Sequence, residues 1–193
     1  MSRKRLTTLD CALLGIVDIE PVSGYDIHRL FSTSPMGAFS SSPGAIYPAL
    51  DRLEKQGLLR AMLDDSTPTR PRRVYSMKEA GEAALEAWLR EPVSRDELVR
   101  SPRVPVLRFS LAERRLSRSE CISYLEGFRR AVTSYAAELR EYVANQPSSG
   151  QVHTRLAVEH GIEGYECQAR WAERATEELK RAPETRLSYG GGS

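Results

Sequence analysis

Residues 42–57, SPGAIYPALDRLEKQG, contain the signals for one helix with a defined start and end. Ser42 fits an N-cap, and Pro43 fits the first helical position, where its missing N–H costs no hydrogen bond. Gly57 is placed to end the helix in the left-handed conformation. Pro48 removes a backbone bond inside the helix, so we expect a bend or a loose first turn there. One buried stripe is predicted at i, i+4 and i+7: Ile46, Leu50 and Leu53.

Two further helices are predicted before this one. Apolar residues near helical spacing over Thr7–Glu20 indicate an amphipathic helix, and Pro21 helps to end it. Ser23 fits the N-cap of a second, short helix, with Asp26 placed as in a capping box. Turn-forming residues fill 32–41 and separate this helix from the third.

The apolar period changes after Gly57 and predicts a hairpin. Leu58–Leu63 and Arg72–Met77 are typical of strands, with a turn rich in Asp, Ser, Thr and Pro between them. Lys78–Arg90 is then a helix. Three helices followed by a hairpin make a winged helix-turn-helix, whose third helix presents its N-terminal end to the DNA major groove while the hairpin is the wing.

The second half of the chain predicts a helical hairpin. Prolines break residues 91–105, and Val106–Leu116 is a short basic helix. Two long helices follow, Ser119–Asn145 and Val152–Arg181. Their heptad-like stripes are Leu125, Phe128, Val132, Tyr135, Leu139 and Tyr142 in the first, and Val158, Ile162, Tyr165, Ala169 and Ala172 in the second.

A hairpin of two helices cannot bury both of its apolar seams alone. We expect the same hairpin of a second copy to cover them, which makes a two-fold homodimer. The fold class is therefore mainly α, an N-terminal winged helix-turn-helix with a C-terminal α-helical dimerisation hairpin. The expected domains are residues 1–91 for DNA binding and 92–182 for dimerisation, with a disordered tail over 183–193.

Composition limits the class of protein. The 193 residues are 40% hydrophobic and 28% charged, which is typical of a globular protein, and the net charge of +2 gives only weak support for nucleic-acid binding. Neither a membrane-spanning run nor a signal segment is recognisable, so we expect a cytoplasmic protein without membrane contact. The three cysteines form no CxxC pair.

Several motifs together resemble the PadR family of transcription regulators. They are LG at 14–15, SGYDI at 23–27, GAIYPAL at 44–50, RLEKQGLL at 52–59, RVYSM at 73–77 and AG at 80–81. The resemblance accounts for Pro48 and covers nearly all of the first 90 residues. The second half is similar only in architecture to the longer members, and Pro102 and Pro105 depart from their smoother helix. The resemblance implies a dimeric repressor that a small hydrophobic or aromatic molecule releases from DNA.

The candidate DNA-binding residues lie at the start of the third helix and in the wing. Hydroxyls and free backbone N–H groups at a helix N-terminus suit phosphate, and arginines suit phosphate or the minor groove. The candidates are Ser41, Ser42, Gly44, Ala45, Tyr47, Arg70, Arg72, Arg73 and Tyr75. The alternative for these residues is an ordinary capped helix and a solvated basic turn.

Trp88 and Trp171 are the candidate effector-binding residues, since flat aromatic rings offer stacking area; the alternative is that both are core anchors. His153, His160 and Glu163 fit a solvated face better than a metal site, so we expect no metal and no cofactor. No motif of an enzyme is visible. The favoured partner is double-stranded DNA carrying an inverted repeat. The alternatives are an activator, or a dimeric winged-helix interaction module or ligand sensor without DNA binding.

Overall fold

The computed structural model describes residues 6–39, 42–64, 72–145 and 152–183. The chain divides into two compact units. The first unit combines Met1–Glu91 with Val106–Leu116, and the second combines Pro92–Pro105 with Ser117–Ser193. The tail expected to be disordered lies outside the described residues, apart from Pro183.

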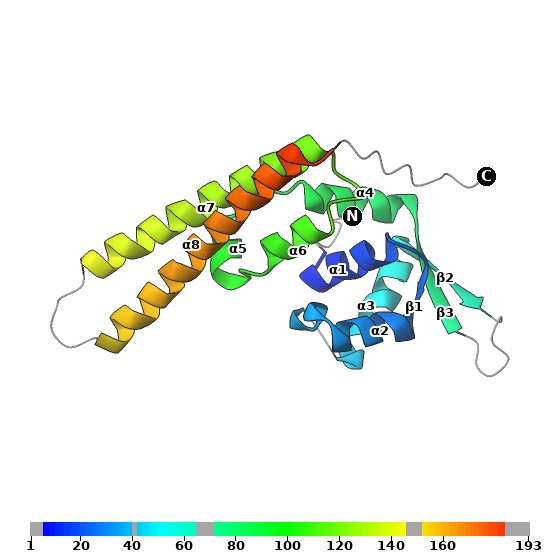
Figure 1. Cartoon of the computed structure of the whole chain (residues 1–193). Coiled ribbons are helices and arrows are strands. Elements are labelled where there is room, and N and C mark those ends of the chain that lie inside the picture. The colour runs from blue at the N-terminus through cyan, green and yellow to red at the C-terminus, as the bar shows by residue number, and fades with distance from the viewer. Residues whose placement is uncertain (1–5, 40–41, 65–71, 146–151, 184–193) are drawn as a thin grey trace. The chain divides into compact units, whose positions relative to one another are not determined.

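Three helices form the centre of the first unit: α1 (Thr8–Val17), α2 (Gly24–Thr33) and α3 (Pro43–Lys55). Thr7 caps α1 in a capping box with Asp10, and Ser23 caps α2 by accepting from the Asp26 N–H. Nearly every residue of α1 is buried, so α1 is the core element of this unit. Figure 1 shows α2 and α3 beside it.

The predicted features of α3 are confirmed in part. Its stripe of Ile46, Leu50 and Leu53 is fully buried, and Gly57 has a positive φ of 73° immediately after the helix. Ser42 occupies the N-cap position, but its side chain makes no capping hydrogen bond. Pro48 lies inside a helix that continues without interruption from Pro43 to Lys55.

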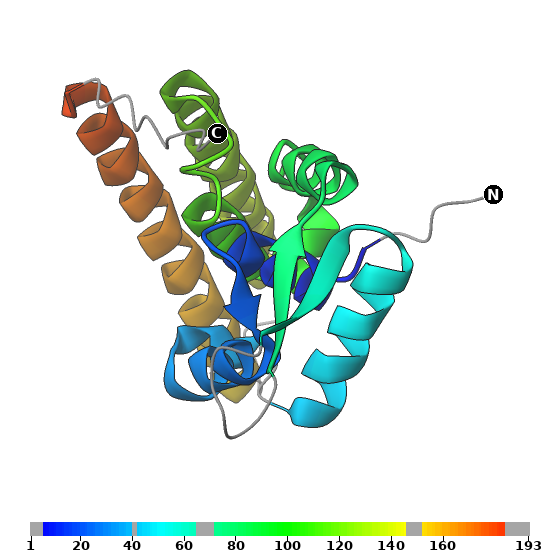
Figure 2. The same cartoon turned by 90° about the vertical axis from the view of Figure 1, so that its right-hand side faces the viewer.

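The sheet has three strands, one more than the hairpin predicted: β1 (Val22–Ser23), β2 (Leu59–Asp64) and β3 (Arg72–Met77). They are antiparallel in the order β1-β3-β2. Leu59 pairs with Met77 at the base of the wing. Strand β1 pairs with the middle of β3, and it therefore brings the start of α2 beside the wing (Figure 2).

Helix α4 (Glu79–Leu89) follows β3 and packs close to the base of the wing. A Cβ added at Gly81 would clash with the backbone carbonyl of Leu58, so only glycine fits there. The chain returns to this unit through α6 (Val104–Ser110). The side chain of Leu111 fills the space beside Gly15, where an added Cβ would lie 2.5 Å from it.

The first unit therefore takes in residues 106–116, which the sequence placed in the second domain. Two contacts explain this difference. Leu111 packs on Gly15 of α1, and Arg115 donates to Asp18 at 2.9 Å and to Glu82 at 3.0 Å. The side chain of Asp18 is only 4% exposed, so the ion pair ties this segment to the end of α1.

The second unit contains α5 (Arg95–Arg100), α7 (Arg118–Ala144) and α8 (Val152–Arg181). Helices α7 and α8 run side by side, as predicted (Figure 1). Phe128 of α7 meets Trp171 of α8 edge to face at 6.2 Å. Helix α5, which the sequence analysis missed, is fixed by the Tyr165 hydroxyl, which donates to the Leu98 carbonyl at 3.1 Å.

Candidate nucleic-acid interface

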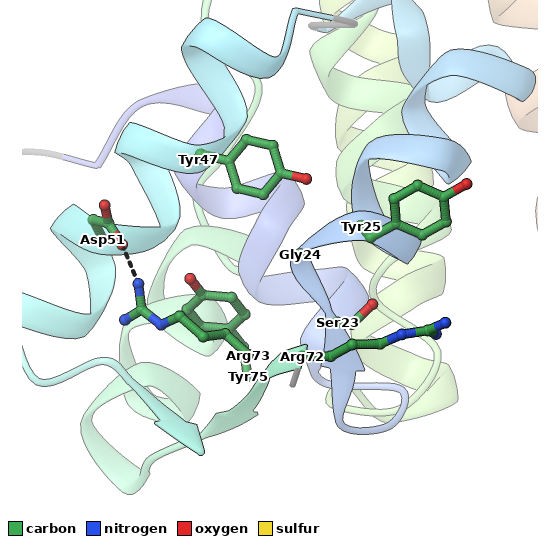
Figure 3. A pocket seen from close by; sticks show the side chains of 8 residues that line it. All are labelled: Ser23, Gly24, Tyr25, Tyr47, Asp51, Arg72, Arg73 and Tyr75. Carbon is green, nitrogen blue, oxygen red and sulfur yellow. Dashed lines mark hydrogen bonds and ion pairs between the residues drawn. The ribbon is translucent and has the colours of Figure 1, made fainter. Parts of the chain in front are cut away.

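A groove of about 500 Å³ opens on the first unit between the start of α2, the middle of α3 and strand β3 (Figure 3). Its lining residues are Ser23, Gly24, Tyr25, Tyr47, Asp51, Arg72, Arg73 and Tyr75. The groove is thus lined by the predicted third helix, by the wing and by the start of α2, which was not predicted to be part of the site.

Backbone pairing assembles this groove. In β1, Val22 pairs with Tyr75 and Ser23 pairs with Val74, so the first turn of α2 is fixed against β3. A Cβ at Gly24 would lie 3.0 Å from the Tyr47 ring. Glycine at this position therefore lets α3 approach α2 closely.

Three tyrosines line the groove at different depths. Tyr25 is 59% exposed and Tyr47 is 40% exposed, and both lie at its rim. Tyr75 is 2% exposed and forms its base. Burial raises the pKa of Tyr75 above its ordinary value; the charge of Arg73 lowers the pKa, but Asp51 and Glu54 oppose that effect, and the net shift is upward. The rim tyrosines can donate hydrogen bonds to an acceptor in the groove.

The two wing arginines have different surroundings. Arg73 donates to Asp51 at 2.9 Å and to Glu54 at 2.5 Å, and its guanidinium lies 5.4 Å from the Tyr75 ring centroid. Arg72 is exposed, and no described residue forms an ion pair with it. In Figure 3 its side chain extends away from Asp51, toward the side of the groove formed by Ser23 and Tyr25.

The predicted DNA-binding residues differ in whether they line the groove. Ser42 and Gly44 are exposed and Ala45 is half-buried at the start of α3, beyond the groove lining, while Tyr47 and Arg72 line it. Ser41 and Arg70 lie outside the described residues.

Two of the predicted DNA-binding residues make contacts within the first unit that the sequence did not indicate. Tyr75 is 2% exposed, and its ring packs under Arg73 at the base of the groove. Arg73 is nearly half exposed, and its charge is balanced by the carboxylates of Asp51 and Glu54 on α3.

The sequence analysis missed four lining residues: Ser23, Gly24, Tyr25 and Asp51. Ser23 was assigned only as a cap, because nothing local indicates that β1 brings it beside the wing. Asp51 and Glu54 did carry a signal. They stand three residues apart, so they share a face of α3 and could have been recognised as a pair that requires a cation.

The two candidate effector-binding tryptophans belong to different units. In the first unit Trp88 packs under the guanidinium of Arg108 at 4.9 Å, and Arg108 is only 2% exposed and donates to the Glu91 carbonyl at 3.3 Å. In the second unit Trp171 packs against Phe128. Each ring is therefore a packed side chain of its own unit.

The described part of the chain contains no group of three metal-ligating side chains. None of its helices is long and apolar enough to cross a membrane.

Comparison with known families matches residues 13–87 to the transcriptional regulator PadR-like family. The match covers 75 of the 193 residues, all of them in the first unit. This PadR-like segment contains every described residue of the groove. The resemblance predicted from the sequence motifs is thus confirmed, and so is the predicted winged-helix fold class. No curated protein matches the chain.

Three solved structures are similar to the whole chain. PadR of Bacillus subtilis in complex with operator DNA has a TM-score of 0.45 and 21% identity, covering 91% of this chain and 99% of that chain. A PadR-like regulator from Bacillus cereus has a TM-score of 0.41 and 22% identity, covering 93% and 99%. PadR of Bacillus subtilis in complex with p-coumaric acid has a TM-score of 0.40 and 20% identity, covering 94% and 100%.

Proposed function

We propose that this chain is a sequence-specific DNA-binding regulator that acts as a homodimeric repressor. The observation that carries the proposal is the groove within the PadR-like segment, where the start of α2, α3 and the wing place an exposed cation and two tyrosine hydroxyls together. An arginine neutralises a phosphate, and a tyrosine can donate to a phosphate oxygen. The start of α3 would enter the major groove of DNA.

Base recognition at the start of α3 relies on small groups. Ser42, Gly44 and Ala45 offer one hydroxyl, one methyl group and free backbone N–H groups. The first turn of α3 has neither Arg nor Asn for bidentate contacts with bases. The proposed regulator therefore depends partly on the shape of the DNA.

The proposed dimer uses the second unit. Three apolar side chains near the loop end of α7 and α8 are about half exposed, namely Tyr142, Val152 and Leu156. A second copy of the same surface would remove them from water. The two DNA-binding units would then bind an inverted repeat, with α3 helices roughly 34–36 Å apart.

DNA binding is tested by gel shift with the full chain on DNA from upstream of its own gene, against a scrambled duplex, at near-physiological salt. Arg72→Ala should weaken binding to all sequences and reduce the magnitude of the slope of log K against log salt by about 1.8, about 0.9 for each protomer of the proposed dimer. Arg60→Ala is the matched control, because Arg60 is exposed on the same hairpin but does not line the groove. If the gel shift shows no preference for the upstream DNA and genome-wide selection of bound fragments finds no preferred sequence, the chain is an interaction module or ligand sensor.

Dimerisation is tested separately by analytical ultracentrifugation. We expect a dimer for the unchanged chain and a monomer for Leu156→Glu, because a charge would be buried at the proposed interface. Thr154→Glu is the control, since residues two apart in a helix do not share a face. If the chain with Leu156→Glu is still a dimer, the interface lies elsewhere.

The proposed effector is a small aromatic molecule. Its support is the family resemblance and the stacking area of the two indole rings. Fluorescence titration with aromatic acids would test it, with Trp88→Phe and Trp171→Phe showing which ring responds. If neither signal changes while DNA release occurs, the effector binds away from both rings.

A further inference from the structure

Arg73 is held on three sides. One terminal nitrogen donates to Asp51 at 2.9 Å, and the guanidinium packs on the Tyr75 ring (Figure 3). The other terminal nitrogen donates to Glu54 at 2.5 Å. Asp51 and Glu54 are one turn apart on α3, while Arg73 and Tyr75 belong to β3. A single side chain thus connects the wing to the helix that the proposed function places on DNA.

The contact with Arg73 also balances negative charge on α3. Asp51 and Glu54 contribute two negative charges beside the groove. Two other cations lie in the last turn of the helix. Arg52 pairs at 2.5 Å with the buried Asp10 of α1, and Lys55 forms no ion pair with a described residue. Without Arg73, two uncompensated carboxylates would face the phosphates of an approaching duplex, and like charges at an interface are unfavourable.

Arg72 is the contrasting case on the adjacent residue. It lines the same groove, and no described residue neutralises it. A free guanidinium can replace the counterions of a phosphate, whereas one already bound by two carboxylates has little net charge to offer.

We infer that Arg73 is a positioning residue that neutralises Asp51 and Glu54 and fastens the wing to α3, while Arg72 supplies the cation for the DNA phosphate. This inference rests on the proposed DNA-binding function. It assigns different roles to two neighbouring arginines that the sequence alone makes equivalent.

The test is differential rescue. DNA affinity is measured by fluorescence anisotropy on the fragment that the unchanged chain prefers, using Arg73→Met and Arg72→Met, each alone and each combined with Asp51→Asn and Glu54→Gln. We expect Arg73→Met to weaken binding about tenfold or more, because it exposes two carboxylates to the phosphates. Removing the carboxylates should restore the Arg73→Met affinity to within about threefold of the unchanged chain. The same removal should rescue Arg72→Met less, because the Arg73 guanidinium that it releases lies on the α3 side of the groove and not on the side toward which Arg72 extends.

The salt dependence provides an independent measurement. Arg73→Met with the carboxylates removed should have the same slope of log K against log salt as the unchanged chain, whereas Arg72→Met should reduce the magnitude of the slope by about 1.8, about 0.9 for each protomer of the proposed dimer. Arg73→Lys keeps the charge but not the two-pronged geometry, so its affinity should lie between those of the unchanged chain and Arg73→Met. Arg73 is nearly half exposed, so the variants should fold, which circular dichroism verifies.

The outcomes separate the two proposals. If the unchanged chain prefers no fragment, the proposed function fails. If it binds selectively but Arg73→Met has no effect, is not rescued, or is rescued no better than Arg72→Met, the inference about Arg73 is overturned and the proposed function stands.

Discussion

Replacing Gly81 with alanine tests the contact between α4 and the base of the wing. The added Cβ would lie well inside 3.0 Å of the Leu58 carbonyl oxygen and 2.8 Å from the sulfur of Met77. The sulfur can move, but the carbonyl is backbone and also accepts from the Lys78 N–H at 3.1 Å. The substitution must therefore displace α4 from the start of β2.

The magnitude follows from three contributions. Overpacking of a tight contact costs about 1–3 kcal/mol. Straining the hydrogen bond to Leu58 adds about 1 kcal/mol. The better helix propensity of alanine offsets about 1 kcal/mol. The net loss is about 1–3 kcal/mol, which lowers the melting temperature of a unit of about 100 residues by roughly 4–20 °C.

The assay uses the placement of the two tryptophans, one in each unit. In a Trp171→Phe background the fluorescence of Trp88 reports on the first unit alone. Gly44→Ala is the matched control, because Gly44 is also in the first turn of a helix of this unit and its added Cβ would meet only the Ser42 hydroxyl at 3.4 Å. Gly44→Ala should be neutral or slightly stabilising. Equal stability of the Gly81→Ala and Gly44→Ala variants would refute the steric argument.

Two further predictions use the same fluorescence signal. Arg115→Met should lower the free energy of unfolding by about 2 kcal/mol, because it leaves the buried carboxylate of Asp18 without its closest cation, whereas Arg29→Met breaks only an exposed pair and should cost less than about 1 kcal/mol. Equal losses in urea denaturation would contradict this. The pKa of Tyr75 is raised, so its contribution to stability is fully present below its ordinary value of 10.0 and is lost as the pH rises through the raised value in the folded protein. Tyr75→Phe should therefore lose less stability than the unchanged chain between about pH 9 and pH 11, and parallel losses would be inconsistent with the shift.

Local signals explain which elements could be predicted from the sequence. Helix α3 has a proline at its first position, an apolar stripe and a terminal glycine, all within sixteen residues. Helices α7 and α8 are long enough for their heptad steps to be unambiguous. Each of these features depends on residues near one another in the chain, so no tertiary contact was needed to recognise them.

The missed elements are short and depend on distant partners. Strand β1 has two residues and exists because it pairs with β3, more than fifty positions away. Helix α5 has six residues between prolines, too few to show a period, and is fixed by contacts such as that with Tyr165.

The candidate site was predicted in location but not in detail. The wing and the start of α3 were both identified, yet the roles of adjacent side chains were not. Arg72 and Arg73 look alike in the sequence, and only the placement of Asp51 and Glu54, 22 and 19 residues from Arg73, distinguishes them. Alternation along β3 could have suggested that Tyr75 is internal, but not that it lies under Arg73.

The discontinuous first unit has a consequence for biosynthesis. The chain passes between the two units three times, after residues 91, 105 and 116. Domains begin to fold while the ribosome is still extending the chain. Here α1 cannot cover its Gly15 face until Leu111 has emerged, and Asp18 must wait for Arg115. By then residues 92–105 of the other unit have already been made, so the nascent DNA-binding unit matures only after the first part of its neighbour has been synthesised.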